Sequence, residues 1–255
     1  MGRESVRLLA QKGFKVYAAT RSPEKLTGAF EGDVTPLYMD ITDPKSVEEA
    51  FCAVERLDIL VNNAGYGLVS TVEELDEKQM FDQFNVNVFG LLRVTKHSIA
   101  LMRRERSGVI INISSFLGKI GLPLLTMYNA TKYAVEGITD SLRYELADFN
   151  IRVHSVMPGF FDTEFARGNL VTNAETFSEE SPYACMVSNL APKIVEQINR
   201  GNDAEDVAEL IYTIIEDENF PARVTVGDKA SKFIPMRKEL SDEDFERRVR
   251  EYYDL

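Results

Sequence analysis

Residues 108–113 read GVIINI, a short run rich in valine and isoleucine that is followed by Ser114 and Ser115. Such an uninterrupted apolar run predicts a strand that is buried on both faces, as in a parallel sheet with helices on each side. Other β-prone runs lie along the chain, and helical patterns separate them. This alternation predicts an α/β fold with a doubly wound parallel sheet. The other expected strands cover residues 14–20, 34–39, 57–61, 151–157 and 223–226.

No repeat, linker or change of composition divides the chain, so we expect one domain over residues 1–255. Residues 160–200 have no clear periodicity and are rich in Phe, Asn, Ser and Met. Because this segment follows a strand end, we expect an irregular substrate-binding loop region there. Residues 237–255 are expected to form a C-terminal helical extension. The expected helices cover residues 1–12, a stretch opened by Asp43 and Pro44, 76–104, 126–149, 203–216 and a charged segment from Asp242.

The composition argues against several classes of function. The chain has 255 residues and a formal charge of −12, and an acidic surface repels phosphate backbones, so no nucleic-acid partner is expected. Two cysteines without a CxxC spacing argue against a disulfide framework, and two distant histidines argue against a zinc site, so no metal is predicted. No apolar run approaches the roughly 20 residues of a membrane helix and no signal peptide is recognisable, which favours the cytoplasm.

Tyr128 and Lys132 stand four residues apart in the expected helix 126–149, so their side chains lie roughly 40° apart around its axis. A Lys ammonium beside a phenol favours the phenolate and would lower the pKa of Tyr128 from about 10. Tyr128 would then be a usable general acid or base near neutral pH. An ordinary surface pair is the alternative, because the spacing arises by chance in about half of chains with this composition.

Further polar side chains stand where the expected strands end. Ser115 follows the strand 108–113 and precedes Tyr128 by thirteen residues, and Asn87 lies inside the expected helix 76–104. The carboxyl ends of parallel strands form the crevice in which dinucleotides bind. Small residues at such an end permit close approach of the backbone to a ligand. Two more segments of this kind are Asn62-Asn63-Ala64-Gly65 and Pro158-Gly159-Phe160-Phe161-Asp162-Thr163.

These motifs, in this order and spacing, resemble the classical short-chain dehydrogenase/reductase family over about residues 2–226, which implies a Rossmann-like fold. The resemblance implies that Tyr128 exchanges a proton with the substrate oxygen and that Lys132 lowers its pKa and binds the nicotinamide ribose. It implies that Ser115 orients the substrate oxygen and that Asn87 anchors a water in a proton relay. Within the family, the chain is most similar to the hydroxysteroid and retinol dehydrogenase branch.

The end of the expected strand 14–20 bears on the choice of cofactor. Enzymes that use NAD place a carboxylate there, whereas this chain has Thr20, Arg21 and Ser22 and no acid before Glu24. A guanidinium with two hydroxyls suits a 2′-phosphate, so we expect NADP(H), with a solvated arginine and NAD as the alternative. The resemblance places further residues around the dinucleotide: Asp40 and Ile41 at the adenine, Asn63, Ala64 and Gly65 at the adenosine ribose, and Phe161 and Thr163 near the carboxamide.

The chain opens in a helix, whereas the family begins with a strand and a Thr-Gly-x-x-x-Gly-x-Gly turn that binds the pyrophosphate. Only the last glycine of that turn is present, as Gly2. The first strand is thus expected to be absent from a central position between the strands 14–20 and 57–61. Two buried strand edges would then lose partners, at about 1–3 kcal/mol for each unsatisfied group. We therefore hypothesise that Met1 is an internal start.

The expected walls of the crevice are mostly apolar, which predicts a lipophilic ketone, aldehyde or alcohol as substrate. Two alternatives are a catalytically weak or inactive dinucleotide-sensing or scaffold protein of the same fold and a sugar epimerase or dehydratase. The resemblance also implies a homodimer or homotetramer through the helices 76–104 and 126–149. The expected wall residues are Tyr66, Phe116, Leu117, Leu122, Met127, Phe160, Phe165, Leu170, Phe177, Tyr183, Met186 and Val187.

Overall fold

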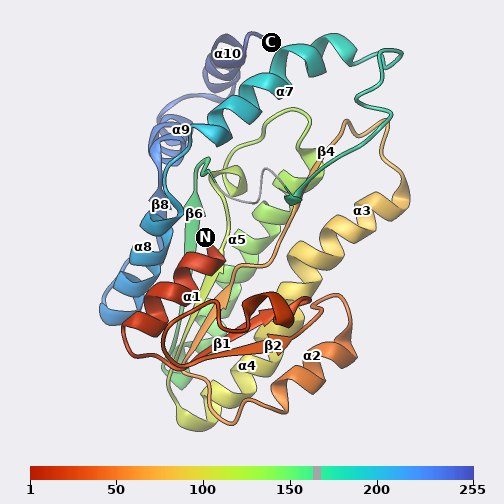
Figure 1. The fold of residues 1–255 in the computed structure, drawn as a ribbon. Coiled ribbons are helices and arrows are strands. Elements are labelled where there is room, and N and C mark those ends of the chain that lie inside the picture. The colour runs from red at the N-terminus through yellow and green to blue at the C-terminus, as the bar shows by residue number, and fades with distance from the viewer. Residues whose placement is uncertain (163–167) are drawn as a thin grey trace.

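A computed structural model describes residues 1–162 and 168–255 of the chain. Its strands form a parallel sheet of four in the order β3-β5-β6-β8, a parallel pair β1-β2, and a second parallel pair β4-β7 (Figure 1). All six residues of β5 are buried, as the sequence predicts. The strands are β1 Val16–Thr20, β2 Val34–Tyr38, β3 Ile59–Asn62, β4 Gly67–Val69, β5 Gly108–Ile113, β6 Ile151–Pro158, β7 Leu170–Thr172 and β8 Arg223–Val226.

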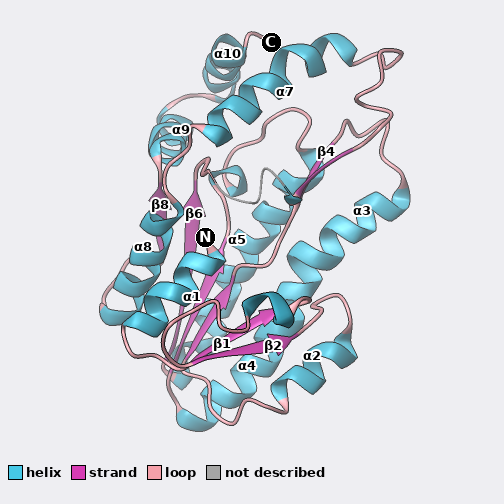
Figure 2. Ribbon diagram, in the orientation of Figure 1, coloured by secondary structure: helices cyan, strands magenta, loops and turns pink. Residues whose placement is uncertain are grey.

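Helices lie on both faces of the four-stranded sheet (Figure 2). Those on one face pack around Ile110 and those on the other around Ile111, because successive side chains of a strand point to opposite faces. This arrangement is the expected Rossmann-like α/β architecture. The helices are α1 Gly2–Gln11, α2 Pro44–Phe51, α3 Glu77–Phe84, α4 Leu91–Glu105, α5 Thr126–Leu146, α7 Ala184–Asn199, α8 Ala204–Glu216, α9 Asp228–Glu239 and α10 Asp242–Tyr253.

The pair β1-β2 is not hydrogen-bonded to the larger sheet within the described residues. β1 pairs only with β2 there, and β3 pairs only with β5. The sequence predicts that a strand is absent between β1 and β3, and the unpaired edges of these two strands agree with that prediction. The described part of the chain therefore presents two strand edges that lack a ladder partner.

The expected helical region 76–104 is confirmed, but it is not one uninterrupted α-helix. It consists of α3 and α4 joined by a π-helical segment, Asn85–Gly90. In this wider turn, Gly90 packs closely against Ile41, which follows β2. A Cβ on Gly90 would come within 2.7 Å of Ile41 Cδ1. Such turns occur often at functional sites, and this one contains Asn87.

The expectation of an irregular segment over residues 160–200 is also wrong for its second half. α7 covers Ala184–Asn199 and buries Leu190, Ile194 and Ile198, which are spaced at helical intervals. Pro192 inside this helix obscured the pattern, since proline usually ends a helix. The expected charged helix from Asp242 is confirmed as α10, and a helix that was not expected, α9, begins before it at Asp228.

Apolar side chains are exposed on the helices for which self-association is expected. Phe81, Phe89, Leu92 and Tyr144 on α3, the π-helical segment, α4 and α5 are all exposed. A homodimer or homotetramer through these helices remains a prediction. Among the described residues, no helix combines the length and the apolar character that crossing a membrane requires.

Candidate active site

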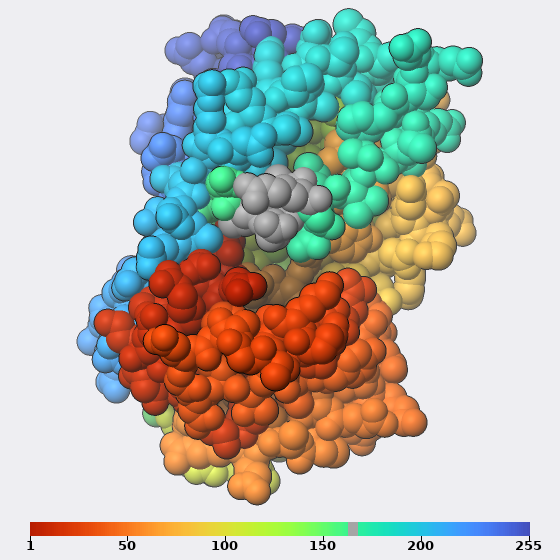
Figure 3. Space-filling model, viewed as in Figure 1, coloured from red at the N-terminus to blue at the C-terminus, as the bar shows by residue number. Residues whose placement is uncertain are grey.

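A cavity of about 560 Å³ opens at the carboxyl ends of β5 and β6. Figure 3 shows this face of the molecule hollowed between the orange and red N-terminal part of the chain and the green and cyan segments. Its position agrees with the rule that ligands bind beyond the carboxyl ends of parallel strands. The polar lining includes Arg3, Glu4, Asn63, Ser114, Ser115, Tyr128, Lys132, Asp162 and Asn169, and the apolar lining includes Ile113, Phe116, Leu117, Leu125, Phe160, Phe161, Leu170, Ile194 and Ile198.

Tyr128 and Lys132 lie in the first two turns of α5 and both line the cavity. Their exposed fractions are 9% and 7%, so neither is a surface residue. The Lys132 Nζ lies 5.6 Å from the centre of the Tyr128 ring and donates a hydrogen bond of 2.8 Å to the carbonyl oxygen of Ile113. The last residue of β5 thus holds the ammonium beside the phenol.

Ser115 follows β5 directly and is buried in the cavity wall. Its Oγ accepts a hydrogen bond of 3.1 Å from the backbone N–H of Leu117 and is also hydrogen-bonded to Tyr128. The end of β5 and the start of α5 therefore bring together the three residues that the sequence predicted for the reacting centre.

The expected lowering of the Tyr128 pKa is wrong for this structure. Burial raises the pKa of Tyr128 above its ordinary value, and the hydrogen bond with Ser115 only partly opposes this. Burial lowers the pKa of Lys132 to about 8, with Glu136 acting in the opposite direction.

Asn87 lies in the π-helical segment and is buried. Its Nδ2 donates to the Tyr66 carbonyl oxygen at 2.8 Å and to Thr131 Oγ1 at 3.0 Å, and its Oδ1 accepts from the Tyr66 N–H at 3.0 Å. A Cβ on Gly65 would lie 3.2 Å from Asn87 Oδ1 and 4.0 Å from Lys132 Nζ. Asn87 therefore joins the end of β3 to α5 beside Lys132, and its water-binding role remains a prediction.

Besides Tyr128 and Lys132, four other predicted cofactor residues line the same cavity, namely Gly2, Asn63, Gly65 and Phe161. A Cβ on Gly2 would come within 2.6 Å of Asn63 Nδ2, so only glycine fits there without movement. Gly2 also opens α1, and the N-terminus of a helix favours anionic groups. These features suit the backbone and amide donors that a dinucleotide phosphate requires.

The other predicted cofactor residues that the structure describes are outside the cavity lining, and Thr20, Arg21, Asp40 and Ile41 lie at or just after the ends of β1 and β2. Arg21 is exposed and acts electrostatically on Asp40. Partial burial acts to raise the pKa of Asp40, but hydrogen bonds from Thr42 hold it below its usual value. Thr20 Oγ1 accepts from the Ser22 N–H at 3.2 Å. The remaining three are Ile41, which packs against Gly90, Ala64, which is exposed, and Thr163, which lies outside the described residues.

The predicted apolar wall is correct for Phe116, Leu117, Phe160 and Leu170. Leu122 and Val187 belong instead to the core cluster behind it, and Phe165 lies outside the described residues. Sequence reasoning missed Ile194 and Ile198 because α7 was not expected. The spacing of Val187, Leu190, Ile194 and Ile198 was the signal that could have revealed them. Tyr66, Met127, Phe177, Tyr183 and Met186 do not contribute to the described lining.

Comparisons with known proteins agree with this geometry. The family described as short chain dehydrogenase matches residues 1–173. A 3-ketodihydrosphingosine reductase of Bacteroides thetaiotaomicron is 31% identical over 226 residues, which cover 89% of this chain and 83% of that protein. A solved short-chain dehydrogenase from Streptomyces avermitilis is 30% identical with a TM-score of 0.81, covering 98% and 95% of the two chains. The structure of ElxO with NADP bound is 26% identical with a TM-score of 0.68, covering 88% and 92%.

The family match covers more than half of the chain, and the sequence and structure relatives extend over most of it. The fold and the arrangement at the carboxyl ends of the strands agree with that assignment. The chain therefore belongs to the classical short-chain dehydrogenase/reductase family and is an oxidoreductase.

Proposed function

We propose that this oxidoreductase interconverts a lipophilic ketone or aldehyde and the corresponding alcohol, with NADP(H) as cofactor and Tyr128 as general acid or base. The observation that carries the proposal is the gathering of Ser115, Tyr128 and Lys132 in one wall of a cavity whose remaining walls are largely apolar. Two hydroxyls with a nearby ammonium supply hydrogen-bond donors and a positive charge, which stabilise a carbonyl oxygen as it gains a proton.

Gly2, Asn63, Gly65 and Phe161 would hold the dinucleotide, which when bound supplies or accepts the hydride. In the reductive direction Ser115 donates a hydrogen bond to the substrate oxygen, and Tyr128 delivers its hydroxyl proton to the same oxygen. The Lys132 ammonium stabilises the phenolate that remains on Tyr128. In the oxidative direction Tyr128 takes the proton of the alcohol. Burial raises the pKa of Tyr128 and so keeps its hydroxyl protonated near neutral pH, which is the form that the reductive direction requires.

The apolar lining supports a lipophilic substrate. Phe116, Phe160, Ile194 and Ile198 offer no hydrogen-bond partner to a polar substrate body. The Bacteroides relative is named a reductase of 3-ketodihydrosphingosine, a long-chain ketone.

Oxidation of NADPH by a series of 2-alkanones of increasing length tests this substrate class. We expect kcat/KM to rise about fourfold for each added methylene until the cavity is filled, as expected when a methylene leaves water for an apolar wall. Replacing Ile194 by Asn should weaken the dependence of kcat/KM on chain length. The same replacement at Val195, an exposed position on the same helix, should leave that dependence unchanged. Equal or faster turnover of short, polar ketones would contradict the proposal.

The exposed Arg21 after β1 supports NADP(H), since a guanidinium suits the 2′-phosphate. ElxO, the relative noted above, was solved with NADP bound.

We expect Arg21→Glu to raise the KM for NADPH about tenfold or more, because a charge-assisted hydrogen bond is lost and a repulsion is added. The KM for NADH should stay within about twofold, since that cofactor lacks the phosphate. Lys25→Glu, an equal change of charge at an exposed position nearby, is the control. An equal effect of Arg21→Glu on both cofactors would contradict this assignment.

A further inference from the structure

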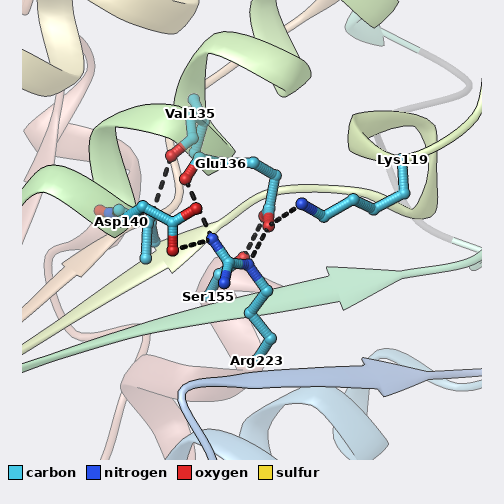
Figure 4. Close-up of polar contacts among 8 residues, drawn as sticks. Lys119, Val135, Glu136, Asp140, Ser155 and Arg223 are labelled. Atoms are coloured by element: carbon cyan, nitrogen blue, oxygen red, sulfur yellow. Dashed lines mark hydrogen bonds and ion pairs between the residues drawn. The ribbon is translucent and has the colours of Figure 1, made fainter. Parts of the chain in front are cut away.

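A buried ion-pair cluster is centred on Glu136 of α5, one helical turn after Lys132 (Figure 4). The side chain of Glu136 is only 3% exposed. Its carboxylate accepts a hydrogen bond of 2.6 Å from Arg223 Nε and another from the hydroxyl of Ser155, and Lys119 Nζ lies 3.5 Å away. Burying a carboxylate is costly, so such a group needs partners of this kind.

The cluster joins the elements that carry the reacting groups. Lys119 stands four residues after Ser115, and Ser155 lies on β6, whose end forms part of the cavity wall. Arg223 on β8 also bonds Asp140 at 2.5 Å and the Glu136 carbonyl oxygen at 3.2 Å. Glu136 therefore connects α5 with β6, with β8 and with the turn that follows Ser115.

The packing between that turn and α5 leaves no spare room. A Cβ on Gly118 would lie 2.9 Å from the backbone oxygen of Lys132 and 3.0 Å from Glu136 Cγ. Lys132 and Glu136 are one helical turn apart, so both face the turn that begins at Ser115. Glu136 therefore lies against the turn that follows Ser115 and stands one helical turn from Lys132, so a change at Glu136 acts on both segments.

Glu136 also places a negative charge one helical turn from the buried Lys132. Burial disfavours the charged form of a lysine, and Glu136 opposes that effect. The Lys132 ammonium otherwise has the neutral Ile113 carbonyl as its hydrogen-bond acceptor and the ring of Tyr128 beside it. Among the residues that the structure describes, the other titratable or charged groups on the elements around it include the Met1 amino group, Arg3, Glu4 and Asp162 in the cavity lining, Tyr66 after β3, and Lys119 after β5.

We propose that Glu136 is a positioning residue for the reaction: anchored by Arg223 and Ser155, its carboxylate keeps Lys132 in the charged form and aligns Lys132 and Tyr128 with Ser115. This inference rests on the proposed role of Lys132 in catalysis. An ion pair that only joined α5 to β8 would leave the titration of Lys132 unchanged. The charge state of Lys132 therefore separates the proposal from a purely structural role.

The test is the titration of Lys132 in Glu136→Gln, followed by NMR of protein labelled with ¹³C at lysine Cε. The Lys132 signal is assigned by its loss in Lys132→Met. Removing the carboxylate should move the titration of Lys132 about one pH unit toward acid, because an opposite charge at short range favours the ammonium. The alkaline limb of kcat for ketone reduction should move in the same direction, and kcat at the optimum should fall about tenfold.

Asp140→Asn is the matched control, because it removes another carboxylate partner of Arg223 on the same helix, two turns from Lys132 and half exposed. It should leave the titration and the pH profile unchanged. Glu136→Gln with Arg223→Met removes both partners of the buried pair, which such sites tolerate better than losing one. Because this double variant also loses the positive charge of Arg223, its acid shift should have the same sign but be smaller, and the measurement remains possible if the single variant does not fold.

A Lys132 titration that stays within about 0.2 pH units of the parent in a folded variant would overturn the proposal. The titration requires neither substrate nor cofactor, so its result is independent of whether the proposed function is correct. If the titration moves while no ketone is reduced by any variant or by the parent, the proposed function fails and the electrostatic coupling stands.

Discussion

Replacing Tyr128 by Phe is expected to lower kcat for ketone reduction about 1000-fold, because the substrate oxygen loses its proton donor. The substitution removes one buried oxygen and keeps the ring, which packs in the core cluster behind the cavity. Neither the fold nor the hydrogen bond from Lys132 to the Ile113 carbonyl depends on the lost hydroxyl. The dissociation constant for NADPH should therefore stay within about threefold of the parent value.

Single-turnover oxidation of NADPH in the presence of substrate measures the chemical step, and fluorescence titration measures cofactor binding. Tyr133→Phe is the matched control, since Tyr133 lies on the same helix but is 47% exposed. Equal rates in the parent and in Tyr128→Phe would contradict the mechanism. Cofactor binding without turnover in the parent would instead favour a dinucleotide-sensing protein.

The sequence was sufficient to predict where the reacting groups meet. Helical spacing places Tyr128 and Lys132 on one side of α5, and a strand buried on both faces must end at the edge of the sheet, where Ser115 stands. These are local consequences of two regular elements that pack together. The family resemblance, and not local pattern alone, predicted Gly2, Asn63 and Gly65 as cofactor residues, and all three line the cavity.

Other features depend on contacts between distant segments and could not be read from local pattern. The pKa of Tyr128 is set by burial, which comes from residues such as Phe160 and Ile198 far along the chain. The ion pair between Glu136 and Arg223 spans 87 residues of sequence. The π-helical turn at Asn87 is recognisable from its packing against Ile41 and Tyr66, which lie far from it in the sequence.

Replacing Lys132 by Met is expected to affect both cofactor binding and chemistry, unlike the change at Tyr128. Methionine fills a similar volume in this buried site but supplies neither the charge nor the donor that the Ile113 carbonyl accepts. We expect kcat to fall about 100-fold to 1000-fold, because the phenolate of Tyr128 loses its stabilising cation. The KM for NADPH should rise about tenfold if Lys132 also binds the nicotinamide ribose.

The pH profile distinguishes this loss of charge from a general disturbance of the site. Burial lowers the pKa of Lys132 to about 8, and a lysine carries its charge only below its pKa. Activity that depends on the ammonium is therefore fully present at lower pH and is lost as the pH rises through about 8. In Lys132→Met the residual activity should lack this alkaline limb, whereas Lys96→Met, at an exposed position on α4, should retain it. An alkaline limb that persists near pH 8 in Lys132→Met would assign that ionisation to another group and would remove the basis for the role of Lys132.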